Sequence, residues 1–220
     1  MITKNVIALL VATLSFNVFA ETTRWKEVKN SHGITVYNRS IEGSSFKAFR
    51  AEMTIESDLT TLMAVFNDVE VGTTWVENVD EMRLVKANSN MDNVTYAMTK
   101  APWPVADRDS VVHNHISQNP DTLAVTIKQE AVPDEVPRTK NKVRIETLHS
   151  TWVFTPISET QTRVTYQVFT EPGGSLPAWL VNKVAISQPY KTFQGLREMS
   201  QKPFYQKVSV EGIRNFHTSI

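Results

Sequence analysis

Apolar and polar residues alternate over most of the middle of the chain, which is the pattern of β-strands with one buried face. The alternation is clearest over 123–130, where Leu123, Val125 and Ile127 fall on one side and mostly polar residues on the other. Turn-forming clusters such as Asn119-Pro120-Asp121 separate the runs at short, even spacing, which indicates antiparallel hairpins. Strands are predicted over 34–39, 46–55, 81–86, 94–99, 109–116, 123–130, 143–155 and 163–170.

Helical spacing interrupts this alternation after the second predicted strand. Ser57-Asp58 offers an N-cap, and apolar residues then recur at positions 59, 62, 63 and 66. A helix is therefore predicted there, followed by a second short helix over 69–75. Residues 25–28 are interpreted as a short opening helix or turn.

A long helix is predicted at the C-terminal end, from Pro177 to about residue 201. We expect a kink at Pro189 and a weak point at Gly195, two places where the helix is able to flex. The predicted fold class is α+β, with a long antiparallel sheet closed by one C-terminal helix.

The first 20 residues have the features of an export signal. Lys4 gives a positive start, positions 6–16 are apolar, and Val18-Phe19-Ala20 precedes the expected cleavage site. The alternative is an uncleaved membrane anchor, which the shortness of the apolar run disfavours. We expect residues 1–20 to be a signal peptide, 21–207 a single domain and 208–220 a C-terminal tail. The mature chain is predicted to be periplasmic or secreted.

Composition narrows the classes of function. The chain has no cysteine, which excludes a thiolate nucleophile, a redox pair and a cysteine–zinc site. Loss of the signal segment removes Lys4 and leaves 22 basic against 23 acidic residues. This balance argues against a nucleic-acid partner, because phosphate binding needs a basic face.

Four ordered motifs connect the sequence to a known family. The most informative contains Pro102-Trp103-Pro104, a stiff loop that presents an aromatic residue, followed by Arg108-Asp109 at the start of a strand. The others are Trp25 with Gly33-Ile34-Thr35-Val36-Tyr37, Phe66-Asn67-Asp68 with Trp75, and the segment from Pro172 to Leu180. In this order the motifs resemble the START family of lipid-transfer domains, over roughly residues 25–202.

The resemblance implies a helix-grip fold, in which a curved sheet wraps the C-terminal helix and leaves a cavity for one lipid. It places the gate of that cavity at the 101–107 loop and at the start of the helix, with Trp103, Trp179 and Leu180 as gate residues. One position departs from the family: sterol-carrying members have a buried arginine where this chain has Asn114. A sterol is therefore not assumed as the ligand.

Candidate site residues follow from strand parity, helix spacing and the resemblance. Arg108 and Asp109 either contact a ligand headgroup or brace the strand, and Trp103 either contacts lipid at the gate or anchors the loop against the helix. The alternative for every cavity residue is an ordinary core position. The cavity candidates are Met53, Met82, Tyr96, Met98, Val112, Asn114, Val125, Ile127, Tyr166, Val168, Val184, Ile186 and Phe193.

The expected function is non-catalytic binding, with possible transfer, of one lipid or other hydrophobic ligand, with transient contact to a membrane surface and no cofactor. The alternatives are a cyclase- or aromatase-like enzyme of the same fold and a ligand-dependent sensor with a protein partner. No nucleophile motif is present in the sequence. His113 and His115 share one face of a predicted strand, but two imidazoles alone make a poor metal site, so no metal is predicted.

Overall fold

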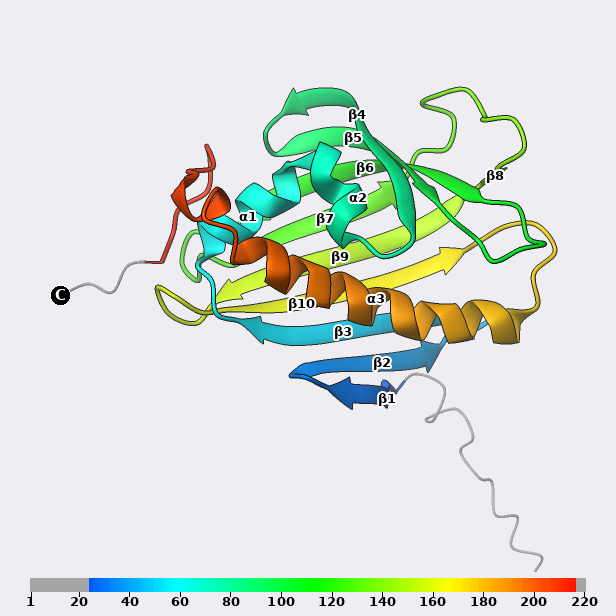
Figure 1. Cartoon of the computed structure of the whole chain (residues 1–220), viewed down its shortest axis with the longest axis horizontal. Coiled ribbons are helices and arrows are strands. Elements are labelled where there is room, and N and C mark those ends of the chain that lie inside the picture. Colours follow the sequence, from blue (N-terminus) through cyan, green and yellow to red (C-terminus); the bar gives the residue numbers. More distant parts are fainter. Residues whose placement is uncertain (1–23, 217–220) are drawn as a thin grey trace, which may run out of the picture.

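The structure is a computed structural model that describes residues 24–216. The predicted signal peptide, 1–20, lies outside the described residues. A long, curved sheet holds one long helix against its concave face (Figure 1). The strands are β1 (Lys26–Ser31), β2 (Ile34–Ser40), β3 (Lys47–Ile55), β4 (Val79–Ser89), β5 (Asp92–Thr99), β6 (Arg108–Gln118), β7 (Val125–Ala131), β8 (Val143–Arg144), β9 (Thr147–Pro156) and β10 (Thr162–Glu171).

The strand order is β1-β2-β3-β10-β9-β7-β6-β5-β4, and all neighbours on this path are antiparallel. The short β8 lies off the path and pairs in parallel with β6. The predicted α+β class and its antiparallel sheet are confirmed. One end of the sheet is formed by β1, β2 and β3 from the early part of the chain, and the other end by strands from its middle part. The late strand β10 pairs with both β3 and β9, and it therefore joins the first three strands to the rest of the sheet.

The helices lie on the concave side of the sheet (Figure 1). They are α1 (Leu59–Asn67), the 3₁₀ turn η2 (Val69–Val71), α2 (Gly72–Trp75), α3 (Ala178–Ser200) and the 3₁₀ turn η3 (Tyr205–Lys207). Asp58 caps α1 as predicted, because its Oδ1 accepts the backbone N–H of Thr61 at 2.8 Å. None of the helices within residues 24–216 is long and apolar enough to cross a bilayer.

Three predicted boundaries are wrong for identifiable reasons. Residues 25–28 are not a helix or turn but enter β1, a mostly exposed edge strand in which no apolar alternation is required. The predicted strand 143–155 is two strands, because residues 143–144 pair with β6, whereas residues 147–156 pair with β10 and residues 149–154 also with β7. Leu123 has a φ of 58°, so it belongs to the turn and β7 begins at Val125.

The predicted C-terminal tail is partly attached in its described portion. The backbone N–H of Arg214 donates to the Gln118 side chain at 2.9 Å, and Val210 and Ile213 pack against the main core. Residues 208–216 therefore cover one end of the sheet.

Gly195 has a role in packing that the sequence did not indicate. It was expected to weaken α3, yet α3 is continuous through this position, and a Cβ placed there would lie 2.5 Å from the Trp75 carbonyl oxygen. The glycine therefore allows α3 to approach the backbone of α2 closely, which helps to hold Trp75 in the core.

Substitution of Gly195 by alanine is expected to lower the free energy of unfolding by about 1–3 kcal/mol, the usual cost of overpacking. The gain of about 1 kcal/mol in helix propensity offsets only part of the clash with α2. Urea unfolding measures the change, and the exposed Glu198→Ala on the same helix is the control, with a change near zero. A stability gain in Gly195→Ala would show that the close approach imposes no constraint.

Candidate ligand-binding cavity

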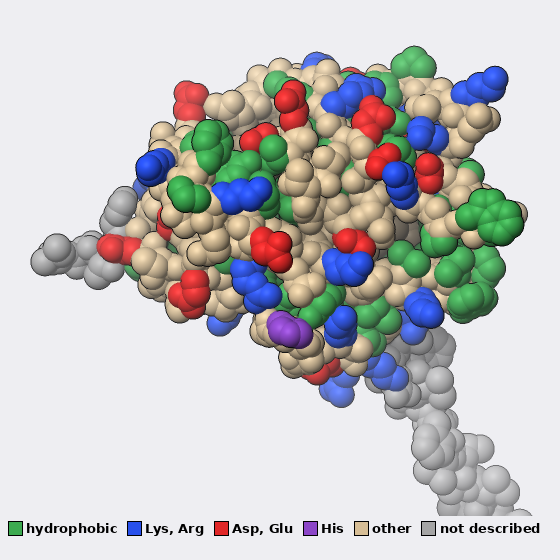
Figure 2. All heavy atoms as spheres, viewed as in Figure 1, with side chains coloured by type: hydrophobic (Ala, Val, Ile, Leu, Met, Phe, Trp, Pro, Cys, Tyr) green, Lys and Arg blue, Asp and Glu red, His purple; other side chains and the backbone are tan. Residues whose placement is uncertain are grey.

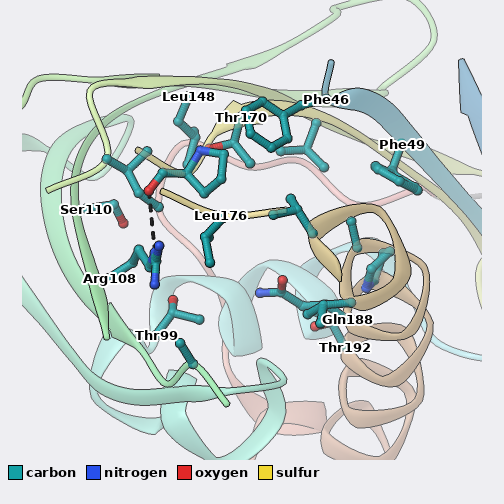
Figure 3. A pocket seen from close by; sticks show the side chains of 18 of the residues that line it. Phe46, Phe49, Thr99, Arg108, Ser110, Leu148, Thr170, Leu176, Gln188 and Thr192 are labelled. Carbon is teal, nitrogen blue, oxygen red and sulfur yellow. Dashed lines mark hydrogen bonds between the residues drawn. The ribbon is translucent and has the colours of Figure 1, made fainter. Parts of the chain in front are cut away.

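A cavity of about 250 Å³ lies between the concave face of the sheet and the first half of α3 (Figure 3). The sheet supplies apolar walls through Phe49 on β3, Leu148 on β9 and Val168 on β10, while α3 closes the opposite side. This placement follows from the fold, because the sheet curves around a helix that contacts β2 and β3 along one edge. The α3 side chains in the wall are Leu180, Val181, Val184, Ala185, Gln188, Pro189 and Thr192.

Two segments that lack regular structure also line the cavity. Pro102 and Val105 come from the loop between β5 and β6, and Pro172 and Leu176 come from the segment that precedes α3. Hydrophobic side chains gather on the surface at the end of the molecule where α3 begins (Figure 2). The predicted gate residue Leu180 lines the cavity.

The two tryptophans assigned to the gate lie on the surface. Trp103 is 92% exposed and Trp179 is 70% exposed, and neither lines the cavity. The alternative in which Trp103 is a loop anchor packed against α3 is therefore wrong for this conformation. Exposed indoles beside an apolar opening are typical of surfaces that contact a membrane interface.

A second, smaller cavity of about 120 Å³, called the inner cavity below, lies under α1 and α2, and the first is called the outer cavity. Its polar wall is a network of neutral amides centred on Asn114, which is only 4% exposed. The Asn114 amide donates to Asn93 at 2.8 Å and to Thr95 at 3.0 Å, and its Oδ1 accepts from Gln129 at 2.6 Å. The position that differs from the sterol-carrying members therefore carries no charge.

Trp152 lines both cavities. Tyr166 and Val76 also line both. The rings of Trp152 and Tyr166 stack with centroids 4.1 Å apart, and the Phe193 ring stacks on Trp152 at 5.6 Å. The indole Nε1 donates to Gln129 Oε1 at 3.1 Å, which fixes the ring. Burial raises the pKa of Tyr166 to about 12, so its phenol stays protonated at neutral pH.

The predicted cavity residues occupy different places in the structure. Tyr166, Val168 and Val184 line the outer cavity, and Met82, Asn114 and Tyr166 line the inner one. Val112 lies on β6 between two lining residues, Ser110 and Asn114, and is buried on the same side by alternation. Five further candidates pack in or against the main core and line neither cavity: Met53, Val125, Ile127, Ile186 and Phe193.

Tyr96 and Met98 are corrections to the predicted cavity. The structure places them on the other face of the sheet, in a separate cluster with Val94 and Val111. The neighbouring Thr95 faces the inner cavity instead, so the parity assigned to β5 was wrong by one residue. The second cluster exists because the 132–142 segment covers that face, and Tyr96 bonds to Thr139 at 3.3 Å.

Several lining residues were not among the candidates. Leu148 and Trp152 are an even number of residues apart on β9 and share its more buried face, so strand parity was a usable signal for both. Pro172 and Leu176 lie in an irregular segment, for which the sequence offers no periodicity.

Arg108 and Asp109 are adjacent in the sequence but belong to different sites. Asp109 forms a fully buried pair with Arg144, with Nη2–Oδ2 at 2.9 Å and Nε–Oδ1 at 3.0 Å. Burial alone would raise the pKa of Asp109, but hydrogen bonds and charge from Arg144 outweigh it and lower the pKa. Asp109 therefore braces β6 against β8, while Arg108 faces the cavity.

The two histidines on β6 share a carboxylate partner on the neighbouring strand. His113 Nε2 lies 3.0 Å and His115 Nδ1 lies 3.6 Å from oxygens of Asp92. Hydrogen bonds from Asn88 and His113 lower the pKa of Asp92 to about 2. These groups are on the opposite face of β6 from Asn114, so they take no part in the cavity.

Comparison with known proteins gives the family. A family model described as START domain matches residues 11–203. The chain belongs to the START family. This confirms the resemblance drawn from the four sequence motifs, and the helix-grip arrangement agrees with it.

Individual relatives span nearly the whole chain. An uncharacterized protein of Pseudomonas aeruginosa is 36% identical and covers 90% of this chain and 96% of its own length. A crystal structure of a STAR-related lipid transfer protein fragment from Xanthomonas axonopodis has a TM-score of 0.76 at 34% identity, covering 81% of this chain and 99% of that one. The phosphatidylcholine transfer protein of Rattus norvegicus is 22% identical over 88% of this chain and 85% of its own.

Proposed function

We propose that this START domain holds one lipid or other hydrophobic ligand in the outer cavity and transfers it without chemical change, through a gate formed by the 101–107 loop and the start of α3. The observation that carries the proposal is an apolar cavity whose lining residues Pro102 and Leu180 are the sequence neighbours of two exposed tryptophans, Trp103 and Trp179. Relatives named as lipid transfer proteins support a lipid as the ligand.

The physical basis is the cost of exposing hydrocarbon to water. Each methylene moved from an apolar site into water costs about 0.8 kcal/mol, so a chain of about 16 carbons is held back by roughly 12 kcal/mol. A carrier that shields the chain lowers this barrier. The cavity supplies the shield, and its mouth allows the chain to pass directly between protein and membrane.

Organic extraction of the purified mature chain, followed by mass spectrometry, tests the proposal. We expect a co-purifying lipid, and we expect the delipidated protein to carry labelled lipid from donor to acceptor vesicles. Protein that yields no lipid on extraction and binds none in titration would refute it.

The enzyme alternative finds less support in the cavity walls. The side chains that line the two cavities within residues 24–216 are apolar, hydroxyl, amide, aromatic or cationic, with no carboxylate or imidazole among them. Tyr166 has a raised pKa and makes a poor general base. We therefore propose binding and transfer without catalysis.

The exposed tryptophans are proposed to contact the membrane during transfer. Trp103→Ala is expected to lower the vesicle-to-vesicle transfer rate about tenfold while stability stays within about 0.5 kcal/mol, because Trp103 is a surface residue. Phe204→Ala is the matched control, since Phe204 is 68% exposed beyond the opposite end of α3. Equal transfer rates for both variants would show that Trp103 is not part of the gate.

We also propose that the protein works outside the cytoplasm after cleavage behind Ala20. Intact mass measurement of protein from a periplasmic extract is expected to give a chain that begins at Glu21. A full-length mass in the membrane fraction would instead establish an anchor.

A further inference from the structure

Arg108 is a buried cation in the wall of the outer cavity. Its residue is only 7% exposed, and its guanidinium points into the cavity from the start of β6 (Figure 3). The three nitrogens donate to backbone carbonyls: Nε to Pro172 at 3.5 Å, Nη2 to Gly173 at 3.3 Å, and Nη1 to Ala106. Within residues 24–216, no carboxylate forms an ion pair with this guanidinium.

This arrangement leaves the guanidinium without an ion-pair partner among residues 24–216. A guanidinium has five N–H groups, so three carbonyl bonds leave two donors for another acceptor. Burial lowers the pKa of Arg108 and the charge of nearby Asp107 opposes this, but arginine stays charged at any physiological pH. The Asp107 carboxylate is engaged with the loop, where it accepts the backbone N–H of Ala101 at 3.0 Å.

The other charged groups of the wall have the same sign. Lys47 and Lys100 complete the charged lining, and Lys100 already pairs with Asp80 at 2.7 Å. Two hydroxyl groups of the wall lie next to Arg108. One belongs to Thr99, which pairs with Arg108 across β5 and β6, and the other belongs to Ser110. A cation flanked by hydroxyl groups therefore lies in the wall of an otherwise mostly apolar cavity.

We propose that Arg108 binds the anionic group of the ligand, a carboxylate or a phosphate, while the hydrocarbon part fills the apolar cavity. This rests on the proposed function and narrows it to anionic lipids, with the charged group held beside the 101–107 loop. The planar guanidinium fork matches both anions, and the ligand would supply the missing counter-charge. The inner cavity offers no such group, because its polar wall consists of neutral side chains that bond to one another.

Pairs of ligands that differ only in charge test the proposal on the unaltered mature protein. Native mass spectrometry compares tetradecanoate with tetradecanol, and lysophosphatidic acid with monoacylglycerol. We expect the charged member of at least one pair to bind about 10- to 100-fold more tightly, as a charge-assisted bond in a buried site allows. Equal affinity within both pairs overturns the anion site but leaves the carrier function intact, whereas binding of none of the four ligands refutes the carrier function itself.

Variants then assign the preference to one side chain. Arg108→Gln should remove the preference for the anion while the neutral ligand still binds, and Arg108→Lys should restore part of it. Arg163→Gln, an exposed arginine on β10, is the charge-matched control and should keep the wild-type preference. An Arg108→Gln protein that folds and still prefers the anion overturns the assignment, and if it does not fold, the ligand pairs on the wild type decide.

A free anion is distinguished from a lipid headgroup by competition. Inorganic phosphate at millimolar concentration should not displace bound lysophosphatidic acid, because the hydrocarbon chain supplies most of the affinity. Displacement by phosphate alone would show that the site takes a free anion, and would overturn the assignment to a lipid.

Discussion

Replacement of Asp109 by asparagine is expected to lower the free energy of unfolding by about 3–5 kcal/mol, the usual cost of breaking a buried ion pair. Both side chains of the Asp109–Arg144 pair are only 1% exposed. Arg144 also donates to the carbonyls of Pro133, Val136 and Pro137, so it fixes the segment that covers the outer face of the sheet. Without Asp109, its charge would remain buried with only neutral partners.

Chemical denaturation measures this change, and an exposed ion pair supplies the control. Asp80→Asn removes the Lys100–Asp80 pair, in which the side chains are 61% and 45% exposed, so its expected effect is below about 1 kcal/mol. Similar unfolding midpoints for the two variants would contradict the conclusion that Asp109 braces β6 against β8. The double variant Asp109→Leu with Arg144→Met should recover much of the loss, because an apolar pair leaves no buried charge.

The effect of Asp109→Asn should also depend on pH. The pKa of Asp109 is lower in the folded chain, so its ionised form favours folding. The contribution is complete above the pKa of an unfolded aspartate, about 3.9, and disappears as the pH falls through the folded value. Stability curves of wild type and variant should therefore be far apart at neutral pH and converge in acid.

The order of the helices and strands was predictable from the sequence, but the pairing of the strands and the strand at the edge of the sheet were not. Periodicity located β3, α1 and α3 because each buries one continuous apolar face. It missed β1, whose residues are largely exposed, and it joined β8 to β9 because a change of pairing partner leaves no mark in the alternation.

The site was predictable to a similar extent. The resemblance located the loop and the start of α3, and both contribute residues to the cavity lining. It did not assign Arg108 and Asp109 to different sites. Alternation along β6 places them on opposite faces, but which face meets the cavity depends on tertiary partners such as Arg144, which comes from a distant part of the chain. Tyr96 and Met98 were misplaced because β5 is buried on both faces, so apolar parity alone does not identify the cavity side.

Substitution of Trp152 by alanine is expected to join the outer and inner cavities and to cost about 3–5 kcal/mol of stability. The indole is 5% exposed, and it is held by the stacked Tyr166 and Phe193 rings and by its bond to Gln129. Its loss would lower the melting temperature by about 6–20 °C for a domain of this size. Differential scanning calorimetry measures that shift.

The joined cavity should also change which ligands bind best. In the native protein the Trp152 ring lines both the outer cavity, of about 250 Å³, and the inner cavity, of about 120 Å³. If the outer cavity holds the hydrocarbon chain, Trp152→Ala should shift the preferred fatty-acid length upward by several carbons in binding titrations. Phe154→Ala is the matched control, because Phe154 is fully buried two residues further along β9 but lines neither cavity. It should lose similar stability without a change in chain-length preference, and an equal shift in both variants would show that general loosening of the core, rather than removal of the wall, admits the longer chain.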